Sequence, residues 1–117
     1  YTLVRVILET GRTHQIRVHM RTIGHPVVAD SEYGNSDACY IEDLIKPVSD
    51  KGMLSLAKLN ELCNNITGPI IERQALHAYK IGFIHPVTDK AMEFTAEIPE
   101  DMSNLITTLR KIKTLLN

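Results

Sequence analysis

The sequence lacks several features that would assign it to a specialised class of protein. Only two of its 117 residues are cysteines, Cys39 and Cys63, which is too few for a disulfide framework and favours reduced thiols in an intracellular protein. No apolar run approaches the roughly 20 residues that a membrane-spanning helix needs, so we expect no membrane association. A formal net charge of -1 argues against a wholly basic nucleic-acid binder. With 44% hydrophobic and 23% charged residues, the composition fits one ordinary globular domain.

Metal and nucleotide signatures are also missing. His14 and His19 are five residues apart, whereas two imidazoles on one helical face would be four apart. Gly11, Gly24 and Gly34 match no glycine-rich phosphate loop. The sequence therefore predicts neither a metal site nor a nucleotide fingerprint.

Charge is unevenly distributed along the chain. Residues 30–73 hold eight acids against four bases. Such a contrast suggests a local anion site in the basic part, although a solvated basic helix face would give the same pattern. Residues 10–25 contain no acid and hold six basic or titratable side chains: Arg12, His14, Arg17, His19, Arg21 and His25.

The first part of the chain has the pattern of a strand followed by a short helix. Residues 1–9 are rich in Leu, Val and Ile on both faces, which is typical of a strand buried on both sides. Gly11 breaks this run, and Thr13 can cap a helix that begins near His14 and ends at Gly24. We expect the buried stripe of that helix to consist of Ile16, Met20 and Ile23.

The remaining elements complete an α+β pattern. Residues 39–51 allow either a short helix or a loop, whereas residues 76–84 and 91–98 predict a hairpin and a helix follows from Pro99. The predicted class is a mainly antiparallel, mixed sheet with helices packed on it. Residues 53–66 predict one more helix, whose apolar face consists of Leu56, Leu59, Leu62, Cys63 and Ile66.

Arg17 stands out chemically within the basic segment. Its neighbours Ile16 and Val18 are apolar, and a partly buried arginine needs a partner. The planar guanidinium suits a carboxylate held through two hydrogen bonds. That carboxylate could belong to a functional site, or it could be a structural acid such as Glu9 or Asp30.

The basic segment also resembles a signature of RNA pseudouridine synthases of the RluA type, specifically their third motif. The similarity continues through residues 23–28 and Asp30. The segment that carries the resemblance is Leu8-Glu9-Thr10-Gly11-Arg12-Thr13-His14-Gln15-Ile16-Arg17-Val18-His19.

A second block, later in the chain, is similar to the next signature of the same family. The resemblance covers most of residues 1–35 and 72–109, with the blocks in family order. Residues 35–72 depart from it, so the helix expected at 53–66 looks like an insertion in the C-terminal part of a catalytic domain. The second block consists of Arg73-Gln74-Ala75-Leu76-His77-Ala78-Tyr79, then Phe83-Ile84-His85-Pro86, Met92-Glu93-Phe94 and Pro99-Glu100-Asp101-Met102.

The resemblance implies a division of roles. Arg17 matches the active-site arginine that pairs with the family's nucleophilic aspartate, whose motif is not in this sequence. We therefore expect a C-terminal piece that is inactive alone and needs no metal or organic cofactor. Leu76 matches a candidate position in the uracil pocket, although a core leucine would look the same. Positions near the RNA cleft are matched by Arg12, His14, Gln15 and Arg21.

The expected partners follow from this resemblance. They are a structured RNA, either tRNA or rRNA, and the missing N-terminal half of the catalytic domain, and we expect a monomer. Two other classes stay open. One is a non-catalytic RNA-binding remnant of the same family, and the other is a binder of small phosphorylated metabolites that uses the helix start near His14.

Overall fold

The α+β class predicted from the sequence is confirmed. The computed structural model describes residues 1–64 and 66–116, without the side chain of Cys63. The prediction of a reduced thiol at Cys63 therefore lies outside the described part of the chain. Four helices and two antiparallel strands make up the described part. In chain order they are α1 (Gln15–Thr22), α2 (Ile41–Ser49), α3 (Leu56–Asn64), β1 (Lys80–Ile84), β2 (Ala91–Thr95) and α4 (Glu100–Leu116).

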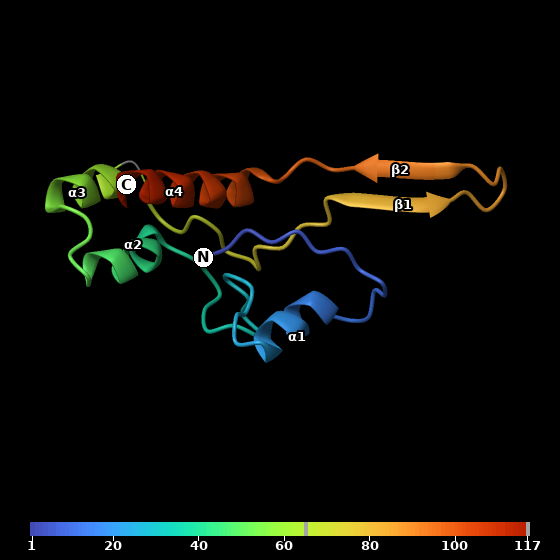
Figure 1. The fold of residues 1–117 in the computed structure, drawn as a ribbon, viewed down its shortest axis with the longest axis horizontal. Helices are drawn as coiled ribbons and strands as arrows, with labels where there is room; N and C mark the ends of the chain where they lie inside the picture. The colour runs from blue at the N-terminus through green and yellow to red at the C-terminus, as the bar shows by residue number, and fades with distance from the viewer. Residues whose placement is uncertain (65, 117) are drawn as a thin grey trace.

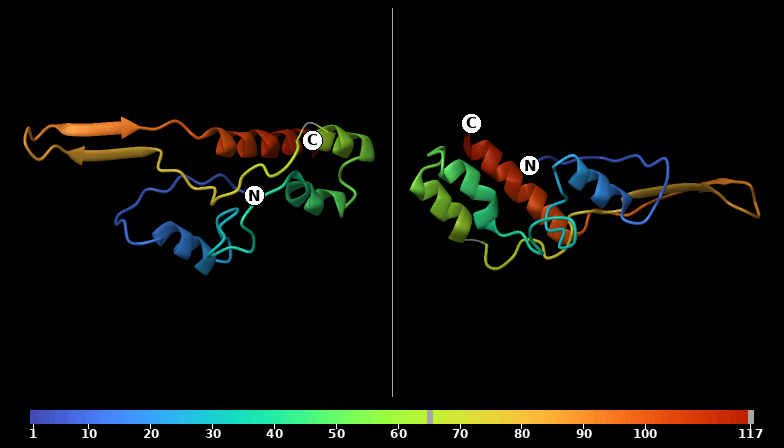
Figure 2. Two further views of the ribbon diagram at one scale, coloured as in Figure 1. Left: turned by 180° about the vertical axis from the view of Figure 1, so that it is seen from behind. Right: turned by 90° about the horizontal axis from the view of Figure 1, so that it is seen from below.

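The core lies where α2, α3 and α4 come together, at the end of the molecule away from the hairpin (Figures 1 and 2). An isolated antiparallel β-bridge joins Cys39 and Ile71, two of the core residues. The Cys39 N–H donates to the Ile71 carbonyl at 2.9 Å, and the Ile70 N–H donates to the Cys39 carbonyl at 2.8 Å. The core side chains include Cys39, Ile41, Leu44, Ile45, Leu54, Leu62, Ile71, Leu105 and Ile112.

The hairpin is confirmed, with shorter strands than the sequence predicted. Lys80 pairs with Thr95 and Ile84 with Ala91, and the rings of Phe83 and Phe94 stack with centroids 6.0 Å apart. The hairpin projects from the helices (Figure 1), and nearly all its side chains are exposed. In the described residues the core helices pack on one another, and no residue of β1 or β2 belongs to the core. The expected packing of helices on the sheet is therefore not observed.

The segment that the sequence left open between a helix and a loop is helix α2. Asp43 accepts the Tyr40 N–H at 2.8 Å, which caps the first turn. The following helix, α3, begins three residues later than predicted, because the Ser55 hydroxyl accepts the Lys58 N–H at its start. Leu56, placed on the buried face by the sequence pattern, is 74% exposed for this reason.

The expectation of a buried strand over residues 1–9 is wrong. These residues form no regular element, and the large side chains there are exposed, Ile7 to 86%. A strand needs a neighbour for its backbone hydrogen bonds, and within the described residues β1 and β2 pair only with each other. The apolar pattern of a strand buried on both faces is present, but this segment has no partner strand among the described residues.

Two details of α1 also differ from prediction. His14, not Thr13, is the N-cap residue, with a left-handed φ of 52° and no side-chain cap. The helix ends at Thr22, so Ile23 leaves the expected buried stripe and is 64% exposed. Gly24 does end the helix as predicted, with a φ of +82° and its N–H on the Arg21 carbonyl.

The molecule is elongated, with principal extents of 61 × 27 × 26 Å. Its radius of gyration is 17.6 Å, whereas a compact chain of this length would have about 13 Å. The projecting hairpin and the unpaired N-terminal run account for the difference (Figure 2). None of the described helices is long and apolar enough to cross a membrane.

Candidate functional site

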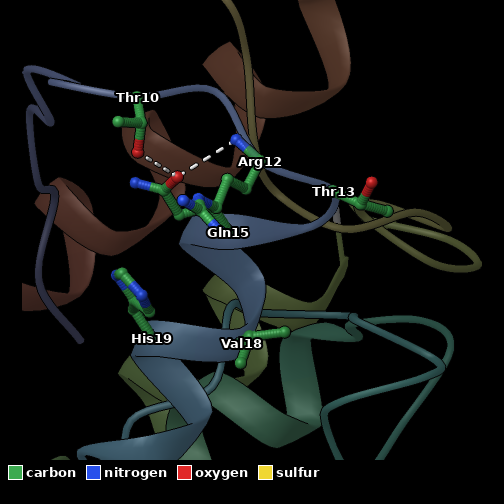
Figure 3. A pocket seen from close by; sticks show the side chains of 6 residues that line it. All are labelled: Thr10, Arg12, Thr13, Gln15, Val18 and His19. Carbon is green, nitrogen blue, oxygen red and sulfur yellow. Dashed lines mark hydrogen bonds between the residues drawn. The ribbon is translucent and has the colours of Figure 1, made fainter.

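The turn that leads into α1 is held by the side chain of Gln15. Its Oε1 accepts the Thr10 hydroxyl at 2.8 Å and the Arg12 N–H at 3.1 Å, and both bonds are visible in Figure 3. A shallow hollow of about 300 Å³ lies over this turn, which we call the α1 hollow. It is lined by Thr10, Arg12, Thr13, Gln15, Val18 and His19.

Arg17 lies one turn further along α1 and is buried, with 11% of its side chain exposed. Its Nε donates to Asp30 Oδ2 at 2.8 Å and its Nη2 donates to Asp30 Oδ1 at 2.6 Å, so the two side chains form a two-pronged ion pair. Of the two structural acids that the sequence left open, Asp30 is the partner. Glu9 is not among the partners of Arg17 within the described residues.

Asp30 is fully buried, and its own turn holds it in place. Oδ1 also accepts the N–H groups of Glu32 and Tyr33, each at 3.1 Å. The hydrogen bonds from Arg17 hold the pKa of Asp30 well below its usual range, and these backbone donors act in the same direction against the effect of burial. The same ion pair raises the pKa of the Arg17 guanidinium. The pair is therefore charged at any physiological pH.

Two further side chains surround the guanidinium. The ring of Tyr33 lies 5.0 Å from the Arg17 Cζ, within the range of a cation–π contact, and Glu32 Oε2 is 3.5 Å from Nη2. The Tyr33 hydroxyl pairs with His14 Nδ1 at 3.0 Å. His14 therefore faces the turn that carries Asp30 and does not line the α1 hollow.

One edge of the guanidinium stays open. Within residues 1–64 and 66–116, Arg17 Nη1 donates no hydrogen bond to a protein atom, and it is not a buried atom without a partner. Nη1 therefore reaches the surface. A second carboxylate could approach this edge while Asp30 occupies the other, because a guanidinium carries five N–H donors in one plane.

The residues predicted near the RNA cleft do not all lie together. Arg12 and Gln15 share the α1 hollow, whereas His14 faces Tyr33, and Arg21 is exposed in the last turn of α1 without lining the hollow. Leu76 is half-buried and lines a separate apolar cavity of about 680 Å³. Ile16, Met20, Met102 and Leu105 are among the other residues around that cavity.

Sequence reasoning missed three contributors to this region. His19 was noted only as part of the basic run, and it lines the α1 hollow. Tyr33 and Glu32 lie in a turn that the residues Gly34 and Asn35 predict, and nothing in the sequence indicates that they face Arg17. The available signal was the turn chemistry itself, because an aspartate followed by Gly34 four residues later predicts a turn whose carboxylate accepts backbone N–H groups.

The described residues gather no metal-binding cluster near Arg17. In the part of the chain that the structure describes, no three His, Cys, Asp or Glu side chains gather in a way that could hold a metal ion. Burial raises the pKa of the Cys39 thiol to about 11, so this residue is protonated and unreactive at neutral pH.

These features define a part of an α+β domain in which a buried arginine, bound to Asp30 through Nε and Nη2, lies on the same helix as the α1 hollow. Comparison with known proteins finds sequence similarity to proteins named RNA pseudouridine synthases. The chain is 39% identical over 111 residues to ribosomal large subunit pseudouridine synthase D of Vibrio parahaemolyticus, which is 95% of this chain and 29% of the relative. It is 41% identical over 104 residues to the protein of the same name from Zymomonas mobilis, 89% of this chain and 26% of that protein.

A relative from Bacillus subtilis gives the same result. The uncharacterized RNA pseudouridine synthase YlyB of Bacillus subtilis is 41% identical over 111 residues, 95% of this chain and 27% of YlyB. No protein-family model matches the chain. The resemblance predicted from the motifs is thus confirmed: the chain is homologous to a segment of RNA pseudouridine synthases and spans less than a third of the length of these relatives.

Proposed function

We propose that the complete protein isomerises uridine to pseudouridine in RNA and that this chain supplies Arg17 and part of the RNA cleft. The observation that carries the proposal is the chain-long similarity to pseudouridine synthases. Arg17 lies in the segment that resembles the third motif of that family. The geometry is compatible with the proposal, because Nη1 has no protein partner among the described residues and could donate to a second carboxylate.

The chemistry would require a nucleophilic aspartate from outside residues 1–117. Arg17 would hold this carboxylate and lower its pKa, typically by ~1–3 units, so that it is ionised at neutral pH. The carboxylate attacks the uridine, at ribose C1′ or at the uracil ring. The N1–C1′ bond breaks, the base rotates, and a C5–C1′ bond forms. The bond between the carboxylate and the uridine breaks again, which frees the aspartate, while C5 loses its hydrogen and N1 gains one. This sequence needs no metal or organic cofactor.

RNA binding would rest on the basic surface around α1. Arg12 and Gln15 line the α1 hollow with His19, and all three suit a phosphate oxygen as donors. Arg21 is exposed on the same helix and could reach a neighbouring phosphate. A structured tRNA or rRNA with the target uridine flipped out of its stack is the substrate class we propose. His14 would contribute to RNA binding only indirectly, because it pairs with the Tyr33 hydroxyl and does not line the α1 hollow.

Leu76 would contact the uracil ring. The cavity beside it is mainly apolar, and its 680 Å³ lie within the ordinary range for a small-molecule pocket. The alternative is that neighbouring side chains of the complete domain fill this cavity, which would make Leu76 a core residue.

The partner we propose for the exposed apolar surfaces is the N-terminal half of the catalytic domain. The relatives are far longer than this chain, and the run of residues 1–8 and both hairpin strands expose large apolar side chains. Residues 35–72, which contain α2 and α3, remain a proposed insertion. A single polypeptide of this kind would be a monomer.

A chimaera tests the proposal. The matched 111-residue segment of the Vibrio parahaemolyticus synthase is replaced by this chain, and tritium release from RNA labelled at uracil C5 is measured. We expect release, and we expect Arg12→Gln to raise the KM for RNA several-fold with little change in kcat. A folded chimaera that binds RNA but releases no tritium would contradict the proposal.

A second candidate is a non-catalytic RNA-binding remnant. The observation in its favour is that Asp30 already satisfies two prongs of Arg17 inside the chain. This candidate predicts RNA binding by the chimaera without tritium release. Turnover would exclude it.

A further inference from the structure

Asp30 is the fully buried centre of a closed hydrogen-bond arrangement. Its two carboxylate oxygens take Nε and Nη2 of Arg17, and Oδ1 also takes two backbone N–H groups of its own turn. A buried carboxylate with so many donors cannot rotate without breaking several bonds at once. Asp30 is therefore a rigid support.

The backbone of the turn reinforces this rigidity. The Gly34 N–H donates to the Asp30 carbonyl at 2.8 Å. A Cβ at position 34 would lie 2.6 Å from that same oxygen, so only glycine allows the turn to close this tightly. The side chain and the carbonyl of Asp30 are thus both fixed by residues 32–34.

We propose that Asp30 is a positioning residue that locks the Arg17 guanidinium by its Nε–Nη2 edge and aims Nη1 at a second carboxylate. The inference rests on the proposed function for that second carboxylate, which would be the nucleophilic aspartate. Nε lies on the locked edge, so the guanidinium cannot turn about its own Cζ–Nε bond while both bonds to Asp30 hold. An arginine without this support would point its open edge in many directions, and the nucleophile would lose its orientation.

The ion pair of Arg17 and Asp30 also determines the electrostatic field that the proposed nucleophilic aspartate would experience at Nη1. Arg17 faces Asp30, Glu32, Tyr33 and, through Tyr33, His14. Asp30 offsets much of the positive charge of Arg17. Removing the Asp30 charge should therefore leave a stronger field at Nη1 and lower the pKa of the nucleophile, although its geometry becomes looser. A lower rate combined with an acid limb at lower pH is a result that loss of folding alone would not produce.

The first experiment uses the 117-residue chain and does not depend on activity. Separate, slowly exchanging Nη signals and a protected Nε–H of Arg17 are expected in nitrogen-15 NMR spectra at low temperature. Asp30→Asn should average these signals, whereas the control Glu32→Gln, which keeps both bonds to Asp30, should leave them separate. Rapidly averaged Arg17 signals in the unsubstituted chain would overturn the proposal without any variant.

The second experiment measures turnover in the chimaera described above. Asp30→Asn should lower kcat about 10²-fold with little change in the KM for RNA, and should move the acid limb of the pH profile down by roughly half a unit to one unit. Asp30→Glu keeps the charge but displaces the guanidinium, so it should recover stability and not kcat. Normal kcat per folded molecule in either variant would refute the positioning role.

Arg17→Ala separates this inference from the proposed function. Normal turnover of Arg17→Ala removes Arg17 from the active site and the proposed function of this residue fails. If Arg17→Ala is inactive while Asp30→Asn turns over normally with an unchanged acid limb, only the role of Asp30 fails.

Discussion

Arg17→Lys should nearly abolish turnover in the chimaera even though it preserves the charge. The guanidinium uses Nε and Nη2 for Asp30 and leaves Nη1 open, so its two edges can serve two carboxylates. A single lysine ammonium has no planar fork and cannot hold both groups in this geometry. The substitution therefore tests geometry with charge held constant.

The size of the effect follows from these contacts. Loss of one preorganised donor at a developing or reacting charge lowers kcat by about 10²–10³-fold, and we expect Arg17→Lys near the lower end and Arg17→Ala near the upper end. RNA affinity should hardly change, because only 11% of the Arg17 side chain is exposed and it cannot also reach a phosphate. The slope of log affinity against log salt should stay within about half a unit of the unsubstituted value.

Single-turnover kinetics at saturating enzyme, together with melting curves, provide the test. Arg110→Lys on the exposed side of α4 is the matched control and should change neither measurement. An Arg17→Lys variant that melts early but turns over normally when folded would show that Arg17 serves only to hold Asp30. That result would refute the reasoning from the open edge.

Three further outcomes are expected. The 117-residue chain alone should release no tritium, and its salt slope for RNA should be about -2, because Arg12 and Arg21 are exposed whereas Arg17 is buried; filter binding across salt concentrations checks this. Ion pairs hold the pKa values of Asp30 and Asp101 low, so their stabilisation is complete above about pH 5 and is lost as the pH falls below about 4, which acid melting curves of the chain and of Asp30→Asn would reveal. Ile71→Ala in the core should lower the free energy of unfolding by about 2–5 kcal/mol in urea titrations.

The sequence predicted the importance of Arg17 but not its partner. Burial and the need for a carboxylate followed from the apolar neighbours Ile16 and Val18, yet Glu9 and Asp30 were equally acceptable. The choice depends on the turn after Asp30, where backbone N–H groups and Gly34 fix the carboxylate. The spacing of Asp30 and Gly34 predicts such a turn, but that the turn lies against Arg17 depends on the path of the chain.

Elements with strong local signals were predicted most accurately. The hairpin has alternating strands and turn residues, and α4 has an apolar stripe with acids in its first turn, so both could be placed from the sequence. Helix α2 could not, because Pro47 near its end and its nine-residue length weaken the helical signal. The start of α3 was misplaced since Gly52 looked like the boundary and the Ser55 cap was overlooked.

The largest error is the strand predicted over residues 1–9. The apolar pattern of this run is that of a strand, but its surroundings among the described residues offer no neighbouring strand. A run of Leu, Val and Ile on both faces stabilises a strand only where a neighbouring strand takes its backbone hydrogen bonds and apolar layers cover its side chains. Neither is available to this run within the described residues. Nη1 of Arg17 likewise has no protein acceptor among those residues, although it reaches the surface. A longer protein such as the relatives could offer a partner to each. If one segment outside residues 1–117 supplied both the partner strand and the proposed carboxylate, a variant that prevents residues 1–9 from pairing should also leave Nη1 of Arg17 without that carboxylate.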